Sequence, residues 1–421
     1  MEPARTTLYR TWLIVLAATA LLLAGALRLP ALAALGGTWA ILLVAAAVVA
    51  RRRLRGLRVR RELHPSAFEE DAVRIELVLE ADRPARMVEV ADSFGPALVV
   101  EHRLLEPGPL GPGLRRRLSY EAFCSRQWGI HTVGPIQAFA SDPAGLFQAR
   151  RVLPDMEEFA VFPRVYEVGR LVQAGARATF SAAEQSAARS GQGPLYLGVR
   201  DHRPGDDLRH VHWPASARRG ALVLKEYEVD LCPYTSVFVD LERRHRAGTG
   251  RKSTLEYVVR SAASVVWTAL RAGGFVQVTG LGARPLHVPP GRGSAHLAYA
   301  LEELIRAAQD GTTPLLEVVL QQLPRVPAGS TAVLLSGTVF LDLGAAEVVL
   351  DAFRARGVRP MFLLVDNYSF PAIEGWPPSR AEVVEKRREV LFFLRARGVA
   401  ARVLEEAQDL EKALAERGET G

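Results

Sequence analysis

The chain has 421 residues, with 53 lysines and arginines against 46 aspartates and glutamates, and a formal net charge of +7 at pH 7. Seven arginines between Arg51 and Arg61 equal that excess, so the rest of the chain is close to neutral and no basic nucleic-acid-binding face is expected. The two cysteines, Cys124 and Cys232, lie far apart in the sequence. They exclude a cysteine zinc site and suit a reducing compartment.

Two apolar stretches open the chain, Thr11 to Leu27 and Ala31 to Ala50, and only three residues separate them. At about 1.5 Å rise per residue, each approaches the ~30 Å hydrocarbon core of a bilayer. We predict two transmembrane helices over 11–27 and 31–50, within a membrane segment of residues 1–56 that ends in a basic juxtamembrane run. The alternative is a cleaved signal peptide followed by a buried helix, which the length of the first stretch and the immediate second one disfavour.

The arginines around these stretches predict their orientation. Arg51 to Arg61 follow the second stretch, whereas the loop between the two holds Arg28 alone. The positive-inside rule then places both termini in the cytoplasm, as a multi-pass protein of the inner cell membrane. The same arginines are expected to contact anionic lipid headgroups.

Short alternating runs broken by glycine, proline and aspartate fill residues 57–166, which predicts a β-sandwich-like domain on the cytoplasmic side. From residue 231 to 421 strand and helix patterns alternate instead, beginning with TSVFVDL and then a helix that Ser253 caps and Gly273 ends. This alternation predicts a doubly wound α/β sheet of parallel strands. Residues 167–230 form a connector, with Gly169 to Ser190 running over the surface, and a segment of unusual composition.

That segment, Gly198 to Glu228, resembles the signature of a membrane-associated family known as domain of unknown function 58, or DUF58. The residues that carry the resemblance are Arg200, Gly205, Asp206, Arg209, Trp213, Ala217, Arg218, Leu222 and Glu228. Further motifs follow the family's order elsewhere in the chain: RQWGIHTVGP at 126–135, DPAGLF at 142–147 and VFPRV at 161–165.

The resemblance implies a von Willebrand factor A-like α/β domain after the signature. It also implies a MoxR-type AAA+ ATPase as partner, and a transglutaminase-like membrane protein as a possible second one. The expected function is therefore that of a membrane-anchored, cytosol-facing adaptor or assembly factor that uses the signature residues for binding. Such a protein has no catalytic activity of its own and needs no cofactor.

The von Willebrand A resemblance makes Asp240 a candidate metal residue, because metal-binding domains of this kind carry DxSxS at the end of the first strand. Here that strand is followed by Asp240, Leu241, Glu242, Arg243 and Arg244, so both serines are missing. Arg244 would also bring positive charge to the place of the cation. We therefore expect a degenerate site without bound metal, and Asp240 as an ordinary strand-end residue.

A second candidate is the histidine group of the signature, His202, His210 and His212. With the neighbouring Asp201, Asp206 and Asp207, these could ligate zinc or manganese in a metal-dependent hydrolase, which is the alternative function. Their spacing matches no specific metal template. Two further interpretations remain open: a structural turn that Asp206 or Asp207 caps and Pro214 closes, with Trp213 in a core, or a loop that binds a partner.

Cys124 could be considered as the nucleophile of a transglutaminase-like reaction, with His131 close to it in the sequence. Its place in a strand-rich segment favours a small core residue instead.

Overall fold

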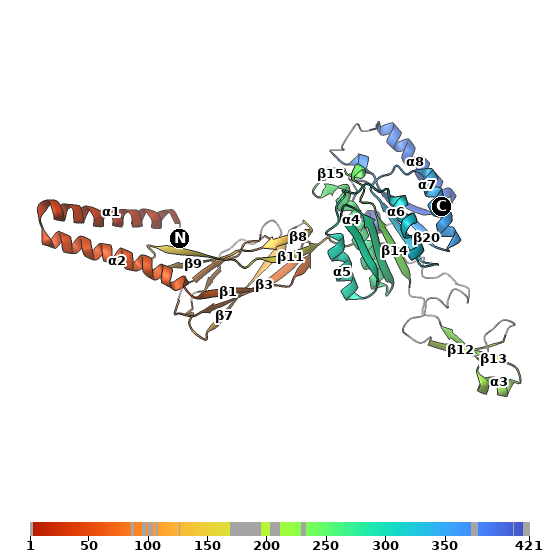
Figure 1. The fold of residues 1–421 in the computed structure, drawn as a ribbon, viewed down its shortest axis with the longest axis horizontal. Helices are drawn as coiled ribbons and strands as arrows, with labels where there is room; N and C mark the ends of the chain where they lie inside the picture. Colours follow the sequence, from red (N-terminus) through yellow and green to blue (C-terminus); the bar gives the residue numbers. More distant parts are fainter. Residues whose placement is uncertain are drawn as a thin grey trace. The chain divides into compact units, whose positions relative to one another are not determined.

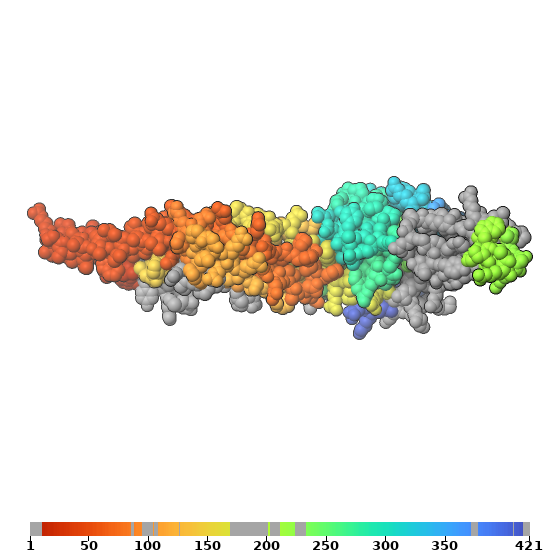
Figure 2. Space-filling model, turned by 90° about the horizontal axis from the view of Figure 1, so that it is seen from below, coloured from red at the N-terminus to blue at the C-terminus, as the bar shows by residue number. Residues whose placement is uncertain are grey.

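The computed structural model describes residues 3–85, 88–94, 98–99, 104–106, 108–125, 127–168, 195–202, 211–228, 233–371, 378–406 and 408–415 (Figure 1). Figure 2 draws the chain in space-filling form, coloured along the sequence from the N-terminus to the C-terminus. The chain divides into two compact units, Met1–Arg164 and Val165–Gly421.

The first unit begins with two apolar helices, α1 (Pro3–Leu27) and α2 (Pro30–Leu54), which lie side by side and antiparallel in Figure 1. The predicted apolar helix pair is thus confirmed, although α2 runs through three arginines beyond Ala50, since arginine is a good helix former. By length and composition, Pro30–Leu54 could cross a membrane, and Thr11–Leu27 is a shorter apolar helix.

Residues spaced by seven form the buried seam between these helices: Ala17 and Ala24 on α1, and Gly36, Leu43 and Ala50 on α2. A Cβ atom added at Gly36 would lie 2.8 Å from the Cγ of Leu21, so the close approach of the two helices requires glycine there. Small residues that let backbones approach are typical of helix pairs in membranes. The outward faces of both helices carry exposed large apolar side chains.

Strands form the rest of the first unit, in three sheets. The first has the order β1-β3-β7-β5, the second β10-β9-β4-β6 and the third β2-β11-β8. Their bounds are β1 Leu57–Glu62, β2 Ser66–Phe68, β3 Ala72–Ala81, β4 Val88–Ala91, β5 Leu98–Val99, β6 Leu104–Glu106, β7 Arg115–Cys124, β8 Gly129–Val133, β9 Ile136–Ser141, β10 Gln148–Leu153 and β11 Glu157–Phe162. Buried side chains of the first two sheets share one hydrophobic core.

The end of α2 is fixed to these strands. The Arg53 guanidinium donates to the carbonyl oxygen of Ser141 at 2.6 Å. On β10, Arg151 donates to the carbonyl oxygens of Leu54 and Leu57 at 2.7 and 3.3 Å, and so satisfies backbone groups that the helix C-terminus leaves free. Leu54 itself is buried in the strand core.

Strand β1 separates the arginines of the basic run onto its two faces. Leu57, Val59 and Arg61 point inward, while Arg58 and Arg60 are exposed. The guanidinium of Arg61 forms a fully buried ion pair with Asp92. The prediction that the whole run from Arg51 to Arg61 meets lipid headgroups is therefore wrong for Arg61, because the two-residue period of the strand places its side chain in the interior.

The second unit contains a six-stranded sheet of order β18-β17-β14-β19-β20-β21, in which β18 pairs antiparallel with β17 and all other neighbouring strands are parallel. The predicted parallel sheet is confirmed. In chain order the strands are β14 Tyr234–Val239, β17 Phe275–Leu281, β18 Pro285–Gly291, β19 Thr331–Ser336, β20 Arg359–Val365 and β21 Ala400–Leu404. Counted along the chain from β14, their spatial order is 3-2-1-4-5-6, that of a doubly wound fold.

Helices cover both faces of this sheet: α4 and α5 lie on one face in Figure 1, and α6, α7 and α8 on the other. Their bounds, with a short last helix, are α4 Thr254–Arg271, α5 Ser294–Leu304, α6 Leu315–Gln322, α7 Leu343–Ala355, α8 Arg380–Ala396 and α9 Leu410–Ala415. Ser253 caps α4 as predicted, accepting a hydrogen bond from the backbone N–H of Glu256. The edge strand β18 and helix α6 were not predicted.

The described residues 195–202 and 211–228 contain a separate antiparallel strand pair and a short helix, which together we call the signature hairpin. Strands β12 (Leu195–Asp201) and β13 (Val223–Glu228) pair antiparallel, and helix α3 (Trp213–Arg219) lies between them in the sequence.

Candidate functional site

The signature hairpin holds some of the predicted binding residues. Arg200 on β12 is paired with Leu224 on β13, and Glu228, at the end of β13, is paired with Leu195. Arg218 lies exposed on α3, and Asp201 lies 3.6 Å from the guanidinium of Arg219. Gly205, Asp206, Asp207, Arg209 and His210 lie outside the described residues, as does the segment 169–190.

Helix α3 begins at Trp213, after the position of the turn that Asp206 or Asp207 is predicted to cap, and these two aspartates lie outside the described residues. The backbone N–H of Ala215 donates to the Nδ1 atom of His212 at 3.1 Å, so His212 is the N-cap and its Nδ1 is already used. Pro214 lies in the first turn, where its missing N–H is tolerated, and does not close the helix. Trp213 is 66% exposed, so of the two open interpretations the one that places this side chain in a core is wrong.

The hydroxyl of Ser216 fixes α3 onto the strand pair. It donates to the carbonyl oxygen of His212 at 3.1 Å and accepts from the backbone N–H of Val223 at 2.9 Å. Gly220 then ends the helix with φ of +68°, in the left-handed region that favours glycine. These hydrogen bonds connect the short helix to β13, and Trp213 lies exposed on its first turn.

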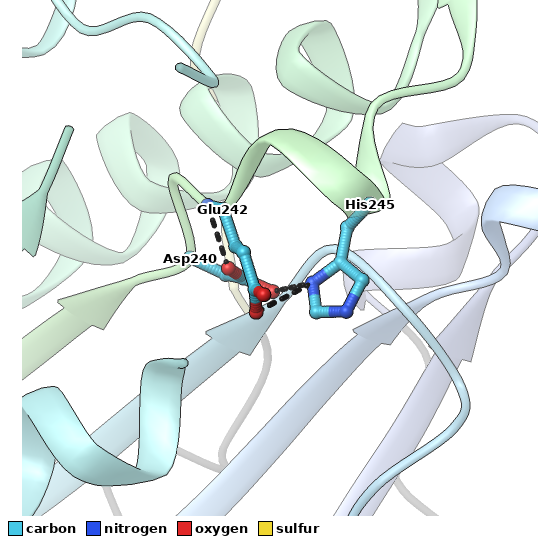
Figure 3. Close-up of side chains that lie close together, drawn as sticks. All are labelled: Asp240, Glu242 and His245. Carbon is cyan, nitrogen blue, oxygen red and sulfur yellow. Dashed lines mark hydrogen bonds and ion pairs between the residues drawn. The ribbon is translucent and has the colours of Figure 1, made fainter. Parts of the chain in front are cut away.

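A second group of side chains lies at the carboxyl end of β14, formed by Asp240, Glu242 and His245 (Figure 3). The Nδ1 atom of His245 lies 2.7 Å from Oδ2 of Asp240 and 3.8 Å from Oε2 of Glu242. Among the described residues, this is the one group of three histidine, cysteine or carboxylate side chains with possible ligand atoms within 4.8 Å of one another. We call it the Asp-Glu-His cluster.

Backbone hydrogen bonds position the cluster. Oδ1 of Asp240 accepts from the N–H of Glu242 at 3.0 Å, and Oδ2 accepts from the N–H of Gly337 at 2.8 Å. Gly337 follows β19, the strand beside β14 on the side where the strand order reverses. Ligands of doubly wound folds bind outside the carboxyl ends of the strands at such a switch point. A turn of 3-10 helix, Arg243–His245, brings the imidazole back to Asp240.

His245 is the member of this cluster that our sequence reasoning missed. The DxSxS pattern covers only the five residues from Asp240 to Arg244, and His245 lies one residue beyond it. A histidine five residues after a strand-end aspartate gives no periodic signal, because only the turn of the loop brings it back to the carboxylate.

The structure does not fit the magnesium site that the von Willebrand A resemblance implies. Glu242 and Arg244 occupy the positions of the two serine hydroxyls, and the Nε atom of Arg244 lies 2.5 Å from Oε1 of Glu242. The Arg244 side chain is 65% exposed, so its charge lies toward solvent on the outer oxygen of Glu242. Asp240 accepts backbone hydrogen bonds, as a strand-end residue does. Its carboxylate also lies beside Glu242 and His245, whose oxygen and nitrogen atoms are possible metal ligands.

Cys124 lies at the end of β7, buried among apolar side chains. Burial, with a smaller contribution from the nearby charge of Asp71, raises the pKa of its thiol to about 11. The nucleophile of a cysteine enzyme needs a lowered pKa. The environment of Cys124 is therefore that of a core residue.

Comparisons with known proteins give little similarity over the whole chain. No curated protein matches it significantly. Solved structures that match include a cohesin module of a Clostridium perfringens family 33 glycoside hydrolase, at 9% identity over 26% of this chain and 98% of that one, with a TM-score of 0.21. Alpha-2-macroglobulin from Escherichia coli matches at 19% identity over 25% of this chain and 16% of that one, also with a TM-score of 0.21. TM-scores this low carry no argument about this protein.

One family model matches the chain, over residues 198–358, which run from the signature hairpin to just past α7. The match thus includes both the exposed Trp213 and the Asp-Glu-His cluster. The family is described as "Protein of unknown function DUF58", and the match supports the DUF58 family for this chain.

Proposed function

We propose that this protein is a membrane-anchored adaptor or assembly factor whose signature hairpin binds a MoxR-type AAA+ ATPase. The observation that carries the proposal is Trp213, a large aromatic side chain that is 66% exposed on a short helix held by Ser216 and Val223. Tryptophan and arginine concentrate binding energy at protein interfaces. Arg218 and Arg219 lie exposed on the same helix, which suits an acidic surface on the partner.

The anchor in this proposal is the α1–α2 pair. Its seam of small residues and its exposed apolar outer faces fit a helical hairpin in lipid. The exposed Arg51, Arg52 and Arg55 follow directly, and they support cytoplasmic placement of both termini by the positive-inside rule. Protease added to spheroplasts, in which the outer face of the inner membrane is accessible, should then leave a tag at the C-terminus uncut, and cleavage of that tag would overturn the orientation.

The two cytosolic parts of the proposal are a β-sandwich-like domain and a von Willebrand A-like domain. The core shared by two four-stranded sheets supports the first. The strand order 3-2-1-4-5-6, with β18 as an antiparallel edge, supports the second. Folds of this kind serve many functions, so the argument for function depends on the signature hairpin.

The proposal is tested by co-elution of the full-length protein, purified in detergent, with the MoxR-type ATPase of the same genome. Trp213→Ala should weaken binding by about 2 kcal/mol, roughly thirtyfold in affinity, if this side chain is a central contact. Phe392→Ala is the matched control, because Phe392 is a 76% exposed aromatic residue on α8, outside the signature hairpin. No binding by the wild type, or equal binding by W213A, would overturn the proposal.

A further inference from the structure

We propose that Asp240, Glu242 and His245 bind a divalent transition-metal ion of the zinc class. This site goes beyond the proposed adaptor function and does not depend on the ATPase. Its ligands also differ from the hydroxyl-based magnesium site that the von Willebrand A resemblance implies.

The geometry of the Asp-Glu-His cluster is close to that of a metal centre. Zinc binds histidine nitrogen and carboxylate oxygen at about 2.0–2.2 Å, so tetrahedral ligands lie about 3.4 Å apart. In the cluster, the Nδ1 atom of His245 lies 2.7 Å from Oδ2 of Asp240 and 3.8 Å from Oε2 of Glu242. Side-chain shifts of less than about 1 Å would therefore bring the three ligand atoms to equal distances around an ion.

A buried oxygen without a hydrogen-bond partner points to a ligand. Glu242 is 5% exposed, and its Oε2 atom accepts no hydrogen bond from any described residue. Buried carboxylate oxygens are normally paired, because desolvation of an unpaired one is costly. This oxygen points toward His245 and Asp240 in Figure 3, where a cation would satisfy it.

The surroundings leave net negative charge for the ion. The carboxylates of Asp240 and Glu242 contribute two negative charges, and Arg244 offsets one of them at the outer Oε1 atom.

A Cβ atom added at Gly337 would lie 3.1 Å from the Cβ of His245 and 3.4 Å from Oδ2 of Asp240, so a side chain there would crowd the cluster.

The ligand types select the class of metal. Magnesium and calcium prefer oxygen ligands alone, whereas imidazole suits zinc and its neighbours. Zinc sites with three protein ligands hold a water or a partner group in the fourth position. To bind the ion through Nδ1, His245 must turn the lone pair of that atom toward it, so the ion would replace the contact between Nδ1 and Oδ2 of Asp240.

The test uses the full-length protein in detergent, stripped of metal by a chelator and dialysed against Zn²⁺. One equivalent should remain bound to the wild type, and excess Mg²⁺ should not displace it. His245→Gln and Glu242→Gln should each weaken binding by more than about tenfold, since each removes one of three protein ligands. His287→Gln is the control, because His287 lies exposed on the edge strand β18.

Circular dichroism of the metal-free variants first establishes that they are folded. Because His245→Gln and Glu242→Gln change different residues, the test still works if one of the two variants does not fold. No stoichiometric Zn²⁺ on the wild type, unchanged affinity in both variants, or displacement by Mg²⁺ would overturn the site.

Discussion

The buried ion pair between Arg61 and Asp92 allows a sharp test of the first unit. The side chains of Arg61 and Asp92 are 0% and 1% exposed, and Arg61 Nε donates to Asp92 at 2.8 Å. The same carboxylate accepts from the hydroxyl of Tyr120 at 3.0 Å and from the backbone N–H of Ser93 at 2.9 Å. Burial, and next the charge of Asp92, raise the pKa of Tyr120, which keeps its hydroxyl a donor.

Replacement of Asp92 by alanine leaves the guanidinium charged and buried without its partner. The expected loss is about 3–5 kcal/mol in the free energy of unfolding, a large part of the roughly 5–15 kcal/mol that stabilises a domain. The matched control is Asp82→Ala, which breaks an ion pair with Arg58 whose side chains are 73% and 59% exposed. That loss should stay below about 1 kcal/mol.

A double-mutant cycle separates the pair from its surroundings. In Arg61→Met with Asp92→Leu, neither charge remains buried, so the double variant should be more stable than the sum of its two single variants by at least about 2 kcal/mol. Unfolding can be followed by pulse proteolysis of the full chain in detergent at increasing urea concentrations. The amount of protease-resistant fragment from the strand unit then reports the folded fraction of that unit. Equal losses for D92A and D82A, or additive losses in the cycle, would refute the reasoning.

Three further outcomes follow from the geometry. Gly36→Leu should disrupt the helix pair, seen as altered cross-linking between α1 and α2, whereas Gly37→Leu should not, because no atom lies within 4 Å of a Cβ at Gly37. In a Cys232→Ser background, Cys124 should remain unreactive to iodoacetamide at pH 8 until the protein unfolds, since its thiol pKa is about 11; fast labelling of folded protein would contradict this. Burial, against the smaller opposing effect of hydrogen bonds and Arg387, raises the pKa of Asp366 above 3.8 in the folded state. The stability of the wild type relative to Asp366→Asn should therefore fall as the pH rises from below 3.8 through that raised pKa, and a rise would contradict the assignment.

The parts that the sequence predicted best have strong local signals. The α1–α2 pair follows from two charge-free apolar stretches, and the helix after Ser253 from a cap and an amphipathic period. The parallel sheet follows from the alternation of strand and helix patterns after residue 231. Strand β18, by contrast, contains Pro289 and Pro290 and lies at the sheet edge, where proline is tolerated, so its sequence is typical of a turn.

The features that were missed depend on contacts between distant residues. Arg61 belongs to a strand whose two-residue period places it inside, yet only the meeting with Asp92 makes that burial possible. His245 reaches Asp240 because a 3-10 turn reverses the chain. Neither partner can be chosen from composition or spacing, because many carboxylates in the chain are equally suitable until the fold selects one.

The connection between the α1–α2 pair and the strand unit bears on the proposed adaptor function. Arg151 donates to the carbonyl oxygens of both Leu54 and Leu57, on either side of the turn that links α2 to β1, and Arg53 donates back to Ser141. The chain thus passes from helix to strand without a flexible linker. Since Leu54 and Leu57 also belong to the strand core, movement of the strand unit relative to α2 would break these hydrogen bonds and expose apolar surface. A force applied to the strand unit would therefore be transmitted to the α1–α2 pair, which is what the proposed adaptor function requires.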